Sequence, residues 1–139
     1  MSHAPNQFLG TWILNPGASA FDANHKPRAG RMQIALEAGG WIVMTADGVN
    51  EHGEPCAERP SRLMPDGQDY PLPDFAGLVV KTTCVDAHTM RSECRRQDGS
   101  IVGAGTFTVS PDGRSMTATT QGWDSQLREF KQTTHWDRQ

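Results

Sequence analysis

The sequence is poor in several features that mark common functional classes. Its three cysteines, Cys56, Cys84 and Cys94, are an odd number without a CxxC pair, which predicts free thiols rather than a disulfide framework or a cysteine zinc site. No apolar stretch approaches the roughly 20 residues that a membrane-spanning helix needs. The 13 basic and 16 acidic residues give a net charge of −3 without any run of Lys and Arg. We therefore expect neither a nucleic-acid partner nor a membrane span.

Motifs for metals, cofactors and nucleophilic catalysis are also missing. The five histidines include no H-x-H or H-x-x-x-H spacing, so the sequence predicts no metal site. Nothing resembles a P-loop, a dinucleotide fingerprint or a nucleophile elbow, and we expect no cofactor. The N-terminal residues lack the charged and apolar regions of an export signal. With free thiols, this pattern favours a cytoplasmic location.

What the chain does have is a regular series of turns with alternating segments between them. Met32, Ile34 and Leu36 point to one side of their segment while the polar residues between them point to the other, as in a strand. Turn signals rich in Gly, Asp and Asn occur at residues 37–40, 50–53, 65–67, 97–99 and 111–113. Nine candidate strands follow, near residues 8–14, 29–37, 40–49, 55–64, 77–85, 89–97, 100–110, 114–123 and 127–137.

These hairpins predict an all-β fold, a single antiparallel up-and-down β-barrel of about 8–9 strands. A barrel protects the edges of so many strands best, because it closes the sheet on itself. Residues 16–28 and 65–76 contain prolines and are interpreted as loops. A β-sandwich is the structural alternative, and only these two loops could supply its longer crossing connection. We expect residues 1–7 to form a flexible tail and residues 8–139 to form the barrel domain.

The opening stretch FLGTWILN, residues 8–15, resembles the Gly-x-Trp signature in the first strand of lipocalin-like proteins. In that superfamily the tryptophan closes the base of the barrel, often under an arginine from the last strand. The resemblance therefore implies that Trp12 closes the base and that Arg138 packs over it. The same opening is also similar to that of avidins, which are eight-stranded barrels.

Two further motifs resemble small bacterial lipocalin-like, calycin-type domains of uncharacterised function. One is the Asp-Gly…Tyr-Pro element at residues 66–71, and the other is the hairpin VSPDGRSMT at residues 109–117. The resemblance implies a barrel with an internal cavity. The C-terminal helix and the disulfides of secreted lipocalins are missing, so it implies no particular ligand.

Large apolar side chains on different strands and loops are the candidates for lining such a cavity, because small-molecule sites are mostly apolar. The alternative is that they fill the barrel completely, since narrow barrels can be packed solid. The candidate ligand-binding residues are Trp41, Met44, Phe75, Met90, Phe107, Trp123 and Phe130, with Trp136 in the same group.

The strand at residues 89–97 is unusually charged. Arg91, Glu93 and Arg95 share one face, and the other face carries Met90. Buried charges cost several kcal/mol unless they are paired, so we expect the methionine face to point inward. The opposite orientation would place an Arg–Glu pair in the cavity, where it would suit a carboxylate or an enolate.

Two functional hypotheses follow, with a barrel serving as a protein-interaction unit as a third. The first is binding of a small hydrophobic or amphipathic molecule, and a homodimer is compatible with it. The second is a cofactor-independent enzyme, such as an isomerase, cyclase or hydratase, acting on a hydrophobic metabolite. Its candidate catalytic residues are Glu93, His135 and Tyr70. Ionisable groups that converge inside the cavity would favour the enzyme, and an apolar lining would favour the binder.

Overall fold

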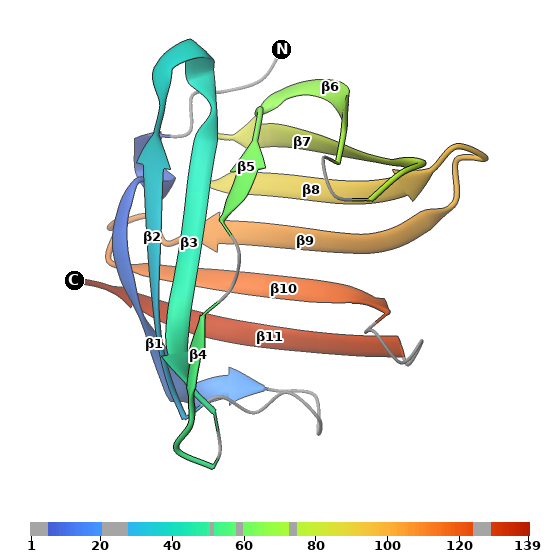
Figure 1. Cartoon of the computed structure of the whole chain (residues 1–139). Helices are drawn as coiled ribbons and strands as arrows, with labels where there is room; N and C mark the ends of the chain where they lie inside the picture. Colours follow the sequence, from blue (N-terminus) through green and yellow to red (C-terminus); the bar gives the residue numbers. More distant parts are fainter. Residues whose placement is uncertain (1–5, 21–27, 51, 58–59, 73–74, 124–128) are drawn as a thin grey trace.

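The structure, a computed structural model, describes residues 6–20, 28–50, 52–57, 60–72, 75–123 and 129–139. In these ranges the chain forms antiparallel strands and two short 3₁₀ turns, η1 (Asn6–Phe8) and η2 (Ala38–Gly40) (Figure 1). No helix within them is long and apolar enough to cross a membrane. The strands are β1 (Gly10–Ala20), β2 (Ala29–Leu36), β3 (Ile42–Val49), β4 (Pro55–Ala57), β5 (Ser61–Leu63), β6 (Asp66–Pro71), β7 (Leu78–Asp86), β8 (Thr89–Arg96), β9 (Ile101–Val109), β10 (Ser115–Trp123) and β11 (Glu129–Arg138).

The strands make one strongly curled sheet in the order β4-β3-β2-β1-β11-β10-β9-β8-β7-β6, with β5 paired to β3. Strand β1 pairs with both β2 and β11, so the first and last strands lie side by side. Figure 1 shows β1 to β3 crossing β7 to β11 at a steep angle, which encloses the space between them. On the opposite side, β5 contacts β7, but among the described residues no backbone strand pairing joins β4 or β5 to β6 or β7. We call this junction without strand pairing the seam.

The predicted all-β, up-and-down architecture is confirmed, but the described residues form eleven strands rather than the eight or nine predicted. The candidate at 55–64 splits into β4 and β5, which are three residues long each. Residues 66–71, predicted as loop, form β6. Its Pro71 is tolerated because it ends a strand at the edge of the sheet.

The loop prediction for residues 16–28 is wrong at its start, where β1 continues through Pro16 to Ala20. A register shift between Asn15 and Ala20 in the pairing with β11 accommodates this continuation. Residues 21–27, the rest of that predicted loop, lie outside the described residues. The Asp-Gly turns predicted at 97–99 and 111–113 are confirmed, and Gly99 and Gly113 adopt φ angles of 90° and 74° that favour glycine. In the turn predicted at 65–67, Asp66 and Gly67 instead begin β6.

Large side chains fill one end of the barrel, which we call the base. They come from η1, from the starts of β1, β3, β8 and β10 and from the end of β9. Antiparallel pairing brings these strand ends together. The fully buried members include Phe8, Trp12, Ile42, Met90, Val109 and Met116. This packed base leaves the other end of the barrel for a site.

The base is closed as the sequence predicted. The guanidinium of Arg138 lies 4.1 Å from the ring centroid of Trp12, and the indole N–H of Trp12 donates to the carbonyl oxygen of Phe8 at 2.9 Å. Arg138 also donates to the carbonyl oxygens of Gln7, Leu9 and Gly113. Of the tail predicted at 1–7, residues 1–5 lie outside the described residues, and Gln7 belongs to η1 and accepts one of these bonds.

Candidate functional site

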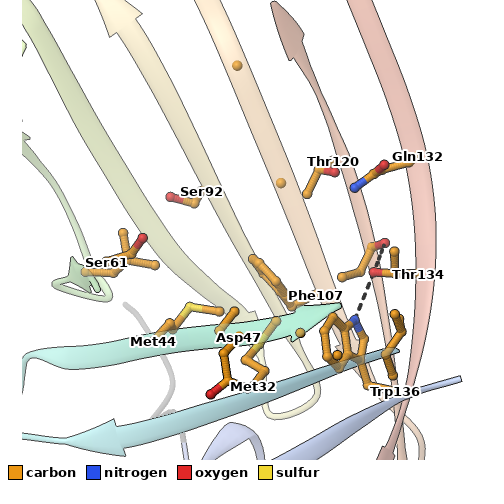
Figure 2. Close-up of a pocket in the computed structure, with 18 of the residues that line it drawn as sticks. Met32, Met44, Asp47, Ser61, Ser92, Phe107, Thr120, Gln132, Thr134 and Trp136 are labelled. Atoms are coloured by element: carbon orange, nitrogen blue, oxygen red, sulfur yellow. Dashed lines mark hydrogen bonds between the residues drawn. The ribbon is translucent and has the colours of Figure 1, made fainter. Parts of the chain in front are cut away.

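Above the base lies a cavity of about 840 Å³ (Figure 2). One wall comes from β1, β2, β3 and β5 and is largely apolar, with Asp47 and Ser61 as its polar members. The residues of this wall include Leu14, Met32, Met44, Ala46 and Leu63. The other wall comes from β7 to β11, and Figure 2 shows Thr120 and Gln132 on it, across the cavity from Met32 and Met44.

The cavity exists because many inward positions above the base carry small residues. These are Gly30, Ala46, Gly48, Gly103, Gly105 and Ala118 among others. A Cβ atom placed on Gly103 would make only an ordinary contact, 3.5 Å from the carbonyl oxygen of Gln121, so the backbone there has room for a side chain that the glycine does not supply. Gly48 has a different role, because a Cβ there would lie 2.3 Å from the carbonyl oxygen of Ala29. That glycine lets β2 and β3 approach each other closely.

A row of polar side chains runs across the second wall. Ser92, Gly105, Thr120 and Gln132 are directly opposite one another on successive strands β8 to β11. Thr82 on β7 extends the row, and its hydroxyl lies 3.0 Å from that of Ser92. We call Thr82, Ser92, Thr120 and Gln132 the polar row. Because positions opposite one another in antiparallel strands share a face, the whole row is turned to the cavity.

Gln132 is the member of the row with an unused acceptor. Its side-chain oxygen Oε1 is buried and has no hydrogen-bond partner among the described residues. The neighbouring polar groups of this wall are satisfied internally. The indole N–H of Trp136 donates to Thr134 Oγ1 at 2.9 Å, and the Thr134 hydroxyl donates to the carbonyl of Ala118 (Figure 2).

The lining carries little charge. Among the described lining residues, the ionisable ones are Asp47, His52 and Cys94. Asp47 and His52 are exposed to solvent, at the end of β3 and in the turn that follows it. Burial raises the pKa of the Cys94 thiol, which keeps it neutral and poorly nucleophilic at neutral pH. In the described part of the chain no three His, Cys, Asp or Glu residues group closely enough to hold a metal ion.

Only some of the predicted ligand-binding residues are found at the cavity among the described side chains. Met44 and Phe107 line the cavity. Met90 is buried in the base, and Phe75 is 59% exposed in the turn before β7. Trp41 packs at the seam rather than against the cavity. The remaining two, Trp123 and Phe130, belong to β10 and β11, and their side chains lie outside the described part of the structure.

Two of the three candidate catalytic residues lie on the outer face of the barrel. Glu93 accepts a hydrogen bond from Arg91 Nε at 2.9 Å, and its neighbours Ser92 and Cys94 are the ones that line the cavity. The methionine face of β8 thus points inward, as expected. His135 also points outward, and its Nδ1 lies 3.1 Å from the hydroxyl of Thr117.

The third candidate, Tyr70, belongs to an aromatic cluster that bridges the seam. The rings of Tyr70 and Trp41 meet edge to face with centroids 5.1 Å apart. The guanidinium of Arg62 lies 5.1 Å from the Trp41 centroid. The Tyr70 hydroxyl donates to the Asp66 carboxylate, and this hydrogen bond raises the pKa of the phenol. Glu93, His135 and Tyr70 therefore do not meet at the cavity.

Sequence reasoning missed several lining residues, above all Met32, Thr120, Gln132 and Thr134. The sequence did contain one indication of the hollow end of the barrel. Phe107, Gly105 and Gly103 share a face of β9, and the side chains on this face shrink from Phe107 toward the start of the strand. This is the pattern expected for a barrel that is packed at one end and hollow at the other.

Fold and cavity together define an antiparallel, up-and-down β-barrel with a packed base and an internal cavity. No known family profile and no curated protein sequence matches the chain. Similar solved structures do exist. The fluorescent protein UnaG aligns with a TM-score of 0.61 at 10% identity, over 96% of this chain and 98% of that one.

Two further structures are similar to the same extent. Rv2717c from M. tuberculosis has a TM-score of 0.58 at 16% identity, over 96% of this chain and 93% of that one. The zebrafish ileal bile acid-binding protein, complexed with cholic acid, has a TM-score of 0.57 at 7% identity, over 96% and 99%. At these identities the similarity shows the fold alone.

Proposed function

We propose that this protein binds a small hydrophobic or amphipathic molecule in its barrel cavity. The observation that carries the proposal is the cavity of about 840 Å³, with a largely apolar wall facing a wall that carries a row of neutral polar side chains. Ligand pockets typically measure about 300–1,000 Å³ and combine an apolar lining with a few polar groups that orient the ligand.

The comparison with the zebrafish protein supports the same function, since a barrel of this shape is complexed there with cholic acid. A filled barrel acting only as a protein-interaction unit is a poorer fit, because the cavity above the base is hollow. We do not propose an enzymatic activity, because Glu93 and His135 lie outside the cavity and Tyr70 does not line it.

The proposal is tested by titrating the protein with Nile red, a neutral hydrophobic dye, and following its fluorescence. We expect saturable binding to the wild type and at least a roughly tenfold weaker affinity for Gly105→Leu. A Cβ at residue 105 meets Phe107 and Thr120 at ordinary contact distances of 3.5 and 3.6 Å. We therefore expect the Gly105→Leu variant to fold normally, with the leucine side chain filling part of the cavity.

Thr108→Leu is the matched control, because Thr108 is exposed on the same strand β9. It adds a leucine outside the barrel and should leave dye binding unchanged. Unfolding of all three proteins in urea verifies that each one is folded. Absence of dye binding to the wild type, or equal binding to Gly105→Leu, would contradict a ligand site in the cavity.

A further inference from the structure

The polar row has a geometry that selects among hydrophobic molecules. Neighbouring strands lie about 4.8 Å apart, so the backbone positions of Ser92 and Gln132, three strands apart, are separated by about 14 Å. Gly105 interrupts the row between Ser92 and Thr120. The row therefore places polar groups toward its two ends and bare backbone in the middle.

The side-chain oxygen Oε1 of Gln132 is a hydrogen-bond acceptor without a donor among the described residues. This buried oxygen has given up water without gaining a partner among the described residues, which is costly for a carbonyl oxygen. A turn of the side-chain amide toward the cavity lets a ligand N–H or O–H donate to this oxygen, which removes the cost. An apolar ligand that lacks a donor leaves it in place, so Gln132 distinguishes between otherwise similar molecules.

The surroundings of the row indicate the shape of the ligand. Gly103 and Gly105 present nearly flat backbone, and the ring of Phe107 lies next to Gly105. Across the cavity, Met32 and Met44 supply flexible apolar side chains that adapt to a ring face. A flat molecule can lie between these two surfaces with one edge at Gln132.

The charge of the lining restricts the ligand further. The described residues of the polar row are uncharged. On the opposite wall Asp47 is the one charged residue among the described lining residues, and it is an anion exposed to solvent near the end of β3. An ionised ligand group placed at the row would lose its hydration without gaining a described counter-ion there.

Given the proposed binding function, we propose that the cavity is specific for an uncharged, flat ring system with an N–H or O–H donor at one edge. Gln132 Oε1 accepts the hydrogen bond from that donor. The methionine and glycine walls hold the two faces of the ring.

Carbazole and 9-methylcarbazole test this specificity, because they are flat, neutral and fluorescent and differ in the single N–H. We expect the wild type to bind carbazole roughly tenfold more tightly than 9-methylcarbazole, the value of one buried hydrogen bond. Carbazole-3-carboxylate, which is anionic at pH 7, is expected to bind at least tenfold more weakly than carbazole.

Gln132→Met keeps the length of the side chain and removes the acceptor. In this variant we expect carbazole to lose its roughly tenfold advantage, while 9-methylcarbazole binds as well as before or better. Gln121→Met is the matched control, since Gln121 is exposed on the neighbouring strand β10. The control should preserve the preference for carbazole.

The outcomes separate the two proposals. Equal binding of carbazole and 9-methylcarbazole to the wild type, or a preference that survives Gln132→Met, overturns the specificity and leaves the binding function standing. Binding of the carboxylate as tight as that of carbazole overturns the requirement for an uncharged ligand. If none of the three probes nor Nile red binds, both the binding function and the specificity are overturned.

Discussion

At the scale of single residues, Arg138 joins several separate parts of the base through its side chain. It lies over the ring of the fully buried Trp12 and donates to three main-chain carbonyl oxygens, those of Gln7, Leu9 and Gly113. These partners come from η1, from the residue directly before β1 and from the β9–β10 hairpin. One side chain thus connects both ends of the chain with a distant turn.

We expect Arg138→Met to lower the free energy of unfolding by about 2–4 kcal/mol, because it removes the charged hydrogen bonds and the cation–π contact while keeping much of the apolar stem. Urea unfolding followed by tryptophan fluorescence measures the loss. Arg96→Met, at an exposed arginine, is the control and should change stability by less than about 0.5 kcal/mol. A similar loss in the two variants would show that the contacts of Arg138 are not what stabilises the base.

The roles of individual residues were predicted well where a local motif fixes them. They were predicted poorly where the role depends on whether the side chain points into or out of the barrel. Trp12 and Arg138 were identified from the Gly-x-Trp opening and the end of the last strand. His135 and Glu93 have the right chemistry for a site, but each is one position away from an inward residue. A shift of one residue in a strand exchanges the two faces, and composition does not reveal which face is turned inward.

At the scale of the elements, the hairpin turns show how short motifs set the ends of strands. In the β9–β10 turn, the Asp112 carboxylate accepts hydrogen bonds from the Ser110 hydroxyl and from the backbone N–H of Arg114. These bonds, the one from Ser110 foremost, lower the pKa of Asp112. Gly113 supplies the positive φ of the turn.

This lowered pKa predicts how stability depends on pH. A carboxyl group whose pKa is lower in the folded state stabilises the fold above its unfolded pKa of about 3.9, and the contribution is lost as the pH falls through the folded value. We therefore expect Asp112→Asn to be less stable than the wild type at pH 7, with the difference shrinking below about pH 4. Urea unfolding at pH 7 and pH 3 measures both differences.

Asp137→Asn is the control for the loss of one negative charge, because Asp137 is an exposed strand residue outside any turn. A difference between Asp112→Asn and wild type that stays constant from pH 7 to pH 3 would show that the charged hydrogen bonds of the turn are not responsible.

The elements that sequence reasoning misjudged are the ones with prolines and few partners. Pro71 and Pro16 suggested loops, yet β6 and the second half of β1 are strands. Proline is excluded only where its missing N–H must join a ladder. Edge strands and irregular pairings lack that requirement, and the sequence does not show which strand is at an edge.

At the scale of the whole molecule, the seam is the least connected part of the barrel. Strands β4 and β5 have three residues each and pair with β3, whereas β10 pairs along its length with both β9 and β11. Trp41, Arg62 and Tyr70 bridge the seam through side chains rather than through backbone hydrogen bonds.

We therefore expect native-state hydrogen exchange to be fastest at the backbone amides of β5 and β6 and slowest at those of β10. Local opening needs less free energy where few backbone hydrogen bonds and few buried contacts must break. Trp41→Ala should raise exchange at β6 and leave exchange at β10 unchanged. Equal protection of β5, β6 and β10 in the wild type would mean that the seam is as stable as the rest of the barrel.

The sequence by itself determined the class of fold and the positions of most tight turns, and its resemblance to lipocalin-like openings implied the contact between Trp12 and Arg138. Each of these depends on local information: the period of two in the strands, the Asp-Gly turns and a short motif at the start of the chain. Only the tertiary structure decided which faces point inward, where the barrel is hollow and that Ser92, Thr120 and Gln132 form one row. The physical reason is that residues distant in sequence become neighbours only through strand register, and the curl of the whole sheet determines which face encloses the cavity.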